Sequence, residues 1–382
     1  MNDLVQYLQD REDDMVELLR ELVLMESPSN DTRLTKAMSN YLYKVVKSMI
    51  KADVTRLSGD LYAPHLKVEW GAGEEQLLIV THLDTVWPEG TLEDMPCKIE
   101  ADKLYGPGSF DMKAGIVQAL FAIQSIEYLD QTLNKKVTLL ITSDEELGSP
   151  TSKSYIEEEA AKSDAVFVLE PAQGEAGALK TARKGVGTYE LTVHGVSSHA
   201  GIEPEKGVSA IEELAEQITY LSNLTSIDQG TTVNVGVIDG GSSKNMIAEE
   251  AHAVVDVRVQ TEVEMTRVVS EIESIKPINN GISIDIQGSI YRPPLERTDG
   301  SEMLFEHAQT LAKQYLNIKL EEESTGGGSD ANFTASLAPT LDGLGAVGDG
   351  AHAKHEHVII HELPKRSALL AMLLRSYGQA SQ

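Results

Sequence analysis

The sequence predicts an α/β fold with a mainly parallel sheet and a ferredoxin-like domain inserted into it. Short, continuously apolar runs at 137–142 and 165–169 are typical of strands buried on both faces of a parallel sheet. Further along, strand and helix patterns follow one another in the order βαββαβ. The length of 382 residues fits two domains. We expect a main domain formed by 1–183 and 290–382 and an inserted domain formed by 184–289.

Apolar periodicity and turn residues place the elements of the main domain. The run that begins at 112 is long enough to favour a helix, whereas the glycine-rich run before 348 is a weaker strand candidate. The expected helices are 4–22, 34–50, 112–129 and 363–377, and the expected strands are 65–70, 76–80, 137–142, 165–169 and 341–347.

The inserted domain is expected to contain four strands and two helices. Their order is that of the split βαβ unit, which fits a compact domain inserted between two halves of an α/β domain. The expected strands are 187–193, 231–238, 251–259 and 282–287, and the expected helices are 205–223 and 262–275.

Charge and cysteine content restrict the partners and the compartment. With 32 basic and 60 acidic residues the formal charge is −28, so nucleic acid and anionic membranes would be repelled. Cys97 is the only cysteine, which excludes an intrachain disulfide and favours a reducing compartment. The charged first residues lack a signal-peptide core, and no run reaches the roughly 20 apolar residues of a membrane span. We expect a cytoplasmic protein whose partners include neither nucleic acid nor a membrane.

Metal-ligand side chains follow directly after several predicted strands. Ligands of open α/β sheets gather at the carboxyl ends of the strands, so these side chains are expected to meet at one place. Asp111 lies in a glycine-rich loop just before the long apolar helix. The other candidates are His82 and Asp84, Asp144, Glu145 and Glu146, Glu170, and Asp349 and His352.

The residue types in this set suit a pair of metal ions. Imidazole and carboxylate are ligands of Zn²⁺, and two ions about 3.5–4 Å apart need a bridging carboxylate. Asp84 is two residues beyond His82 and could accept the second imidazole N–H. Glu145 and Glu146 are adjacent, so one could bind metal while the other faces the attacking water.

Each feature also has an ordinary structural explanation. A single His-x-Asp is usually a surface turn or a hydrogen-bonded pair, a Glu-Glu pair is usually solvated, and a glycine-rich loop is usually only a turn. Their joint placement at strand ends is what favours a metal centre.

The ordered motifs resemble those of the M20 metallopeptidases, and the bacterial glutamate carboxypeptidases in particular. They extend from 81 to 356, so the resemblance covers nearly the whole chain. The motifs are THLDTVWPEGTL (81–92), YGPGSFDMKAG (105–115), SDEELGS (143–149), LEPA (169–172), SSHAG (197–201), KNMI (244–247), TGGGSDANF (325–333) and GAHAKHE (350–356).

The resemblance implies two Zn²⁺ per subunit, with Co²⁺ or Mn²⁺ as alternatives, and a role for each ligand. It also implies a cis peptide after the bridging aspartate, at Asp111–Met112. His355 and His357 compete with His352 for the last ligand position, and the spacing to Glu356 selects His352. The implied roles are His82 and Glu170 on one metal, Glu146 and His352 on the other, Asp111 as bridge, Asp84 as the residue that orients His82, and Glu145 as general base.

For the inserted domain the resemblance implies a lid and a homodimer interface. His199 would reach the partner subunit's active site and polarise the scissile carbonyl, although a histidine in a loop is its ordinary interpretation. Either arginine of the substrate set could instead belong to a surface ion pair. The implied substrate-binding residues are Asn245, Arg258, Arg292, Gly327 and Gly328.

The expected reaction is hydrolysis of an amide or peptide bond beside a free carboxylate, which releases a C-terminal amino acid such as glutamate. The alternative is an N-acyl-amino-acid deacylase of the acetylornithine or succinyl-diaminopimelate kind, which the sequence Arg183-Lys184-Gly185 resembles. A third hypothesis is a catalytically inactive metal-binding homologue, but the chain retains Glu145 and all five ligands.

Overall fold

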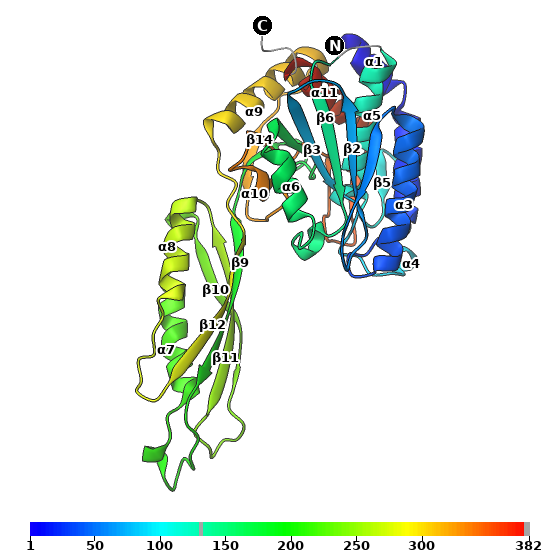
Figure 1. Ribbon diagram of the computed structural model, residues 1–382. Coiled ribbons are helices and arrows are strands. Elements are labelled where there is room, and N and C mark those ends of the chain that lie inside the picture. The colour runs from blue at the N-terminus through cyan, green and yellow to red at the C-terminus, as the bar shows by residue number, and fades with distance from the viewer. Residues whose placement is uncertain (130–132, 378–382) are drawn as a thin grey trace. The chain divides into compact units, whose positions relative to one another are not determined.

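The computed structural model describes residues 1–129 and 133–377, which fall into two units (Figure 1). Of the described residues, those of Met1–Thr181 and Arg297–Ser324 and those from 329 to 377 form the first unit. The second comprises Ala182–Glu296 with Thr325–Gly328. Each has its own sheet and its own apolar core.

The sheet of the first unit has six strands in the order β1-β2-β6-β3-β7-β14. β3 runs parallel to β6 and β7, and β14 runs parallel to β7, whereas β1 and β2 are antiparallel additions at one side. This confirms the predicted α/β class with a mainly parallel sheet. The strands are β1 (Asp53–Leu57), β2 (His65–Gly71), β3 (Gln76–His82), β6 (Lys136–Thr142), β7 (Ser163–Val168) and β14 (Thr340–Leu341).

Helices cover both faces of this sheet, with α6 on one face and α5 and α11 on the other (Figure 1). All seven residues of β3 are buried, and its apolar run at 77–80 is typical of a strand covered on both faces. Asp31 begins α3 by accepting hydrogen bonds from the backbone N–H groups of Arg33 and Leu34. The helices are α1 (Asn2–Gln9), α2 (Glu12–Leu24), α3 (Thr32–Met49), α4 (Thr91–Asp94), α5 (Ala114–Tyr128), α6 (Lys153–Ala160), α9 (Asp299–Leu311), α10 (Ala331–Thr334) and α11 (Leu363–Tyr377).

A second small sheet of the first unit has the order β15-β16-β5-β4. It joins the chain just before the Asp111 loop to the chain on either side of His352. Its strands are β4 (Lys98–Glu100), β5 (Lys103–Tyr105), β15 (Gly348–Asp349) and β16 (His357–Ile359); a further pair is β8 (Leu179–Arg183) with β13 (Glu322–Thr325).

The second unit has an antiparallel sheet in the order β10-β11-β9-β12, which is the strand order of a ferredoxin-like unit. Burial alternates along β11, so one sheet face packs on the helices while the other faces outward. This confirms the predicted βαββαβ pattern. The elements are β9 (Gly185–His194), α7 (Ala210–Ser222), β10 (Thr232–Gly240), β11 (Glu250–Val259), α8 (Glu262–Glu273) and β12 (Ser283–Arg292).

Three expectations about elements were wrong. The single helix expected at 4–22 is two helices, α1 and α2, which break at Asp10–Arg11. The helix expected from 205 begins at Ala210, because Ser209 accepts a hydrogen bond from the Glu212 N–H and Pro204–Lys206 form a separate turn. The strand expected at 341–347 ends at Leu341.

Candidate metal centre

Three strand ends of the large sheet bring predicted ligands together. β3 pairs in parallel with β6 so that His82 lies opposite Thr142, and with β7 so that Val80 lies opposite Val168. The chain leaves β6 toward Glu145 and Glu146 and leaves β7 toward Glu170. Because parallel strands end at the same edge, these side chains converge there.

Asp111 lies between the two predicted histidine ligands and presents one carboxylate oxygen to each. Its Oδ1 is 3.3 Å from Nε2 of His82, and its Oδ2 is 3.4 Å from Nε2 of His352. The peptide bond between Asp111 and Met112 is cis, as predicted. A carboxylate shared in this way has the arrangement of a bridging ligand.

One glutamate accompanies each histidine. Glu170 Oε1 is 3.6 Å from Nε2 of His82, and Glu146 Oε2 is 3.3 Å from Nε2 of His352. The structure thus brings together all five residues predicted to bind metal. Candidate ligand atoms within 4.8 Å of one another form two groups, one of His82, Glu145 and Glu170 and one of His82, Asp111 and Glu146.

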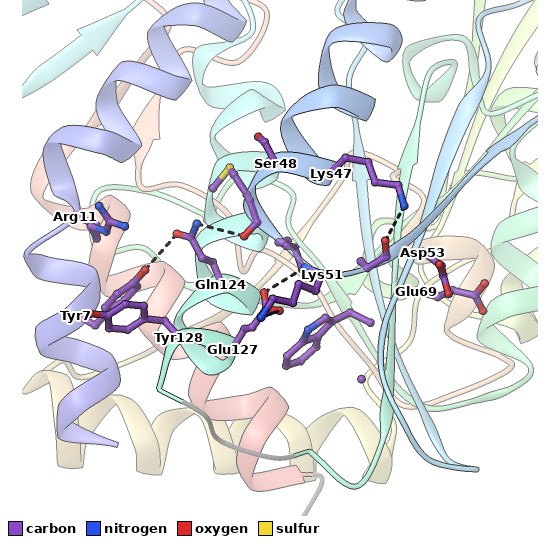
Figure 2. Close-up of a pocket in the computed structure, with 15 residues that line it drawn as sticks. Tyr7, Arg11, Lys47, Ser48, Lys51, Asp53, Glu69, Gln124, Glu127 and Tyr128 are labelled. Atoms are coloured by element: carbon purple, nitrogen blue, oxygen red, sulfur yellow. Dashed lines mark hydrogen bonds and ion pairs between the residues drawn. The ribbon is translucent and has the colours of Figure 1, made fainter.

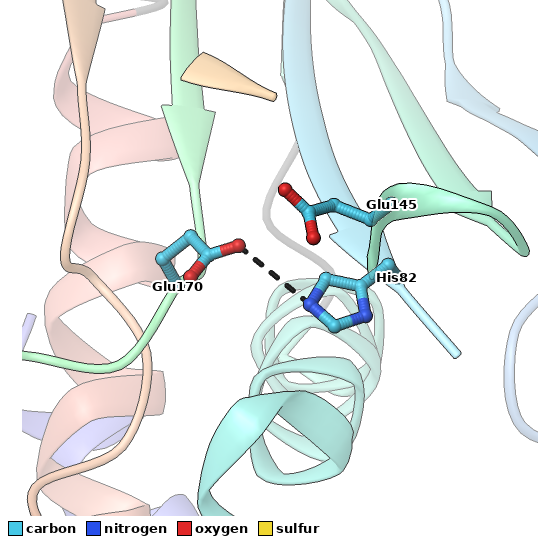
Figure 3. Close-up of side chains that lie close together, drawn as sticks. All are labelled: His82, Glu145 and Glu170. Carbon is cyan, nitrogen blue, oxygen red and sulfur yellow. Dashed lines mark ion pairs between the residues drawn. The ribbon is translucent and has the colours of Figure 1, made fainter. Parts of the chain in front are cut away.

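The predicted base, Glu145, lies beside His82 and Glu170. Figure 3 shows Glu145, His82 and Glu170 pointing toward one another from three different segments. Glu145 is in a short 3₁₀ turn, Glu145–Leu147, and only 8% of its surface is exposed. The adjacent Glu146 pairs with His352, although both carboxylates lie near His82 and the backbone here is a 3₁₀ turn rather than extended as expected.

Two features of the cluster fit a pair of metal ions: its carboxylates are negatively charged, and one buried carboxylate oxygen has no hydrogen-bond donor in the described part of the chain. Glu146 Oε1 is buried and has no hydrogen-bond partner among the described residues, although a buried carboxylate oxygen normally has one. Two imidazoles among four carboxylates supply the oxygen and nitrogen donors that Zn²⁺ prefers. This donor set is coherent with divalent cations.

The pKa values of the two histidines and of Asp111 show that carboxylates dominate the charge of this cluster. Hydrogen bonds to Asp111 and then to Glu146 raise the pKa of His352 to about 10. Burial opposes a charge on His82, yet its hydrogen bonds to Asp111 and Asp84 hold its pKa well above the usual value. Burial also opposes ionisation of Asp111, but the two imidazoles keep its pKa far below its usual range. The carboxylates therefore stabilise positive charge between them, whether it is carried by protons or by metal ions.

Asp84 supports the site with both its backbone and its side chain. His82 Nδ1 lies 3.0 Å from the Asp84 carbonyl oxygen and 3.5 Å from its carboxylate, so the nearer acceptor is the carbonyl rather than the predicted carboxylate. A carbonyl only accepts, so Nδ1 donates a proton to it, and a metal ion would take the place of the proton on Nε2. The buried carboxylate accepts hydrogen bonds from Ser29 Oγ and from the backbone N–H groups of Glu145 and Glu146.

The other two histidines of the C-terminal motif have different surroundings. His355 Nε2 lies 3.4 Å from Asp349, and most of the His355 side chain is exposed. His357 is in β16, where its Nδ1 donates to the carbonyl of His355. His352 is the one beside Asp111, and its backbone has a positive φ of 59°.

Glu356 was not assigned a role from the sequence, yet it joins three loops of the centre. Its buried carboxylate accepts hydrogen bonds from the backbone N–H groups of Gly108, Phe110 and Asp111 at 2.9–3.0 Å. The indole N–H of Trp87 donates to it at 2.7 Å. Burial raises the pKa of Glu356 to about 7. The signal available in the sequence was only its fixed spacing from His352.

We expect Glu356→Gln to destabilise the centre, although it replaces none of the side chains predicted to bind metal. Glutamine has one acceptor oxygen, so its amide N–H₂ would face two of the four donors, at a cost of about 1–3 kcal/mol for each group left unsatisfied. Urea unfolding should show a lower free energy of unfolding, and the purified protein should contain less metal. Glu100→Gln, an exposed carboxylate on β4, is the matched control. Equal stability and metal content in both variants would contradict this role.

All residues predicted to bind substrate, and His199, belong to the second unit. Arg258 donates to both carboxylate oxygens of Asp256, which is the ion-pair alternative stated for it. Asn245 accepts from Ser243 Oγ, and His199 Nδ1 accepts from the Gly201 N–H.

The remaining three residues of that set are Arg292, Gly327 and Gly328. Arg292 is buried, with 4% of its surface exposed. Arg183 donates to the carbonyls of Gly327 and Gly328 at 3.1 and 3.4 Å. Their part in binding substrate stays a prediction.

A pocket of about 780 Å³ lies elsewhere in the first unit (Figure 2). Its walls include Tyr7, Arg11, Lys51 and Trp70 from helices and strands near the start of the chain. None of the predicted site residues lines it. The predicted ligands thus lie at the strand ends and not in this pocket.

Residues 78–376 match the family of peptidases described as M20/M25/M40. The chain belongs to peptidase family M20. This confirms the resemblance drawn from the motifs, and the protein is an enzyme, a hydrolase of M20 type. No helix within residues 1–129 and 133–377 is both long and apolar enough to cross a membrane.

Two relatives resemble the chain along most of its length. Carboxypeptidase G2 of a Pseudomonas species is 29% identical over 99% of this chain and 92% of its own length. The succinyl-diaminopimelate desuccinylase of Pelagibacter ubique is 25% identical over 82% of this chain and 85% of its own length.

Solved structures show the same fold. The aminopeptidase PepT of Bacillus cereus has a TM-score of 0.82 and 23% identity, with 95% of this chain and 98% of that chain covered. A Bacillus subtilis protein described as a dinuclear metal-binding peptidase of family M20 has a TM-score of 0.68 and 14% identity, with coverage of 96% and 98%.

Proposed function

We propose that the protein is a two-metal hydrolase that cleaves an amide bond beside a free carboxylate and releases a C-terminal amino acid. The observation that supports this most is the carboxylate of Asp111, whose two oxygens face two different histidines. A single metal ion would not need a ligand shared in this way. The proposed metal is zinc, with cobalt or manganese as alternatives.

In this proposal five side chains hold the metals. When bound, the two ions polarise the scissile carbonyl and lower the pKa of a water molecule toward neutrality. The proposed set is His82 and Glu170 for one ion, Glu146 and His352 for the other, and Asp111 between them.

Glu145 is proposed as the general base. Its carboxylate lies near the ligand atoms of His82 and Glu170. His352 is paired with Glu146, the next residue in the sequence, and not with Glu145. Glu145 accepts a proton from the attacking water and passes it to the leaving amine, which needs one group that is first base and then acid. Asp84 holds the backbone of this turn and the Nδ1–H of His82 in place.

The inserted segment 184–289 is proposed as lid and homodimer interface, with His199 as a donor to the substrate carbonyl. Asn245, Arg258, Arg292, Gly327 and Gly328 are proposed to bind the substrate, since guanidinium groups can bind a carboxylate bidentately. Arg258 would have to exchange Asp256 for the substrate carboxylate. Location in the cytoplasm is proposed from the single cysteine, Cys97.

Hydrolysis of an N-acyl amino acid is the second candidate function. It is favoured by the desuccinylase among the relatives and by the Arg183-Lys184-Gly185 sequence. Both reactions use the same metal-binding residues and differ only in the substrate pocket.

A release assay distinguishes the candidates. The zinc-loaded protein would be incubated with N-acyl-glutamates, dipeptides with C-terminal glutamate, N-acetylornithine and N-succinyl-diaminopimelate, and the free amino acids quantified. Glutamate release without acetate or succinate release supports the carboxypeptidase, and the reverse pattern supports the deacylase. No hydrolysis of any amide by the metal-loaded protein would support the inactive homologue.

We expect removal of metal by a chelator to abolish hydrolysis and to destabilise the first unit. A ligand present at 1,000 times its dissociation constant adds about 4 kcal/mol to the free energy of unfolding. In a domain of this size that lowers Tm by on the order of 10 °C when the metal is removed. Differential scanning calorimetry before and after dialysis against the chelator, followed by addition of zinc, measures both loss and recovery. A Tm that does not respond to the chelator would contradict a metal-dependent fold of the site.

A further inference from the structure

Arg366 is a buried cation whose partners are backbone carbonyls. It lies in the first turn of α11, and only 4% of its surface is exposed. Its Nε donates to the carbonyl of Gly345 at 2.9 Å, and its terminal nitrogens donate to the carbonyls of Gly177, at 3.0 Å, and Gly343. The nearby Glu362 pairs with His361 and Lys365 instead.

This placement does not help the helix itself. The first turn of a helix has a partial positive charge, which disfavours a cation there. Burial also lowers the pKa of Arg366 to about 10, although the guanidinium remains protonated at neutral pH. Burying a charge is unfavourable unless hydrogen bonds compensate for the lost hydration. The benefit must therefore lie in the carbonyls that the guanidinium holds.

These carbonyls belong to two segments next to Glu170, a predicted metal ligand. One segment follows Glu170 in the chain, and the other is hydrogen-bonded to it. The Gly343–Gly345 segment runs beside the end of β7, where the Leu344 N–H donates to Val168 and the Gly345 N–H donates to the carbonyl of Glu170. Gly177 is in the loop that follows Glu170, and a side chain at Gly177 would collide with Val347.

The same segment continues directly toward His352. After Gly345, the carbonyl of Ala346 accepts from Ala172 N–H and that of Val347 accepts from Ile359 N–H. The chain then enters β15 and reaches His352 four residues after Gly348. One guanidinium thus joins the backbone that flanks Glu170 to the backbone that leads to His352.

We propose that Arg366 is a positioning residue of the metal centre, which fixes Glu170 and His352 at their separation by holding the carbonyls of Gly177, Gly343 and Gly345. The inference rests on the proposed metal-binding function. Asp111 is held separately, through Glu356, so loss of Arg366 would displace two ligands relative to the bridging one.

Zinc affinity of the metal-free protein tests this role. Zinc would be titrated in competition with a chromophoric chelator into the wild type, Arg366→Met and Arg366→Lys, and stoichiometry and Tm would be measured on the same samples. We expect Arg366→Met to bind zinc 10–100-fold more weakly, as is usual for residues that orient ligands. Lysine keeps the charge, but its ammonium lacks the planar fork that reaches three carbonyls, so Arg366→Lys should show a smaller loss.

Two comparisons separate the possible failures. Arg375→Lys, on the same helix and beside Met1, is the matched control and should bind zinc like the wild type. Wild-type zinc affinity in a folded Arg366→Lys protein, with a lower Tm of the metal-free form only, would show a purely structural role and overturn the inference. If Asp111→Asn also keeps wild-type affinity, the proposed function itself fails; if only that variant loses zinc, the inference about Arg366 alone fails.

Discussion

Replacing Glu145 by glutamine is expected to lower kcat by about 10²–10⁴-fold while both metal ions remain bound. Glutamine has nearly the same shape but cannot accept the proton of the attacking water. Glu145 lies beside His82 and Glu170, yet the five proposed ligands are complete without it. Steady-state kinetics with the best substrate of the release assay, together with metal analysis, measure both parts of the prediction.

Glu157→Gln is a suitable control, because this residue is on α6, its side chain is half-exposed, and its carboxylate is 3.8 Å from Lys153 Nζ. A Glu145→Gln protein that has lost one metal ion would show that Glu145 is a ligand rather than the base. Unchanged kcat with full metal content would refute the assignment of the base.

Replacing Asp111 by asparagine is expected to remove at least one metal ion per chain and all measurable hydrolysis. An amide has one acceptor oxygen in place of two, so it cannot face both His82 and His352 as the carboxylate does. It also removes the negative charge between two sites that must each hold a divalent cation. Metal stoichiometry by elemental analysis is the decisive measurement.

The matched control for this variant is Asp53→Asn, an exposed aspartate at the start of β1. Two tightly bound ions in the Asp111→Asn protein would mean that the bridge is not Asp111. The proposal for two metals would then lack its main support.

The two sheets and the place where the ligands meet could be predicted, because the apolar pattern of each strand is a local property of the sequence. The uninterrupted apolar sequences of β3, β6 and β7 require burial on both faces, and the side chains that follow them must meet at one sheet edge. The alternating pattern of β11 likewise identifies a sheet with one covered face. The convergence of His82, Glu146 and Glu170 follows from the topology.

Contacts made by the backbone could not be predicted in this way. The run at 341–347 is apolar and glycine-rich like a strand, but after Leu341 the chain turns at Gly343, which has a positive φ of 73°, and its carbonyls go to Arg366. Similarly, Glu356 accepts hydrogen bonds from backbone N–H groups of residues that lie 245–248 positions earlier in the sequence. Periodicity contains no information about such distant partners.

The position of the ligands along the chain has a consequence for biosynthesis. His82 and Asp111 are translated early, the ferredoxin-like unit follows, and His352 and α11 come last. Contacts between such distant parts of a chain form late in folding. The proposed set of metal ligands is therefore complete only once the residues after 340 have joined β7, and we expect metal loading to follow that step.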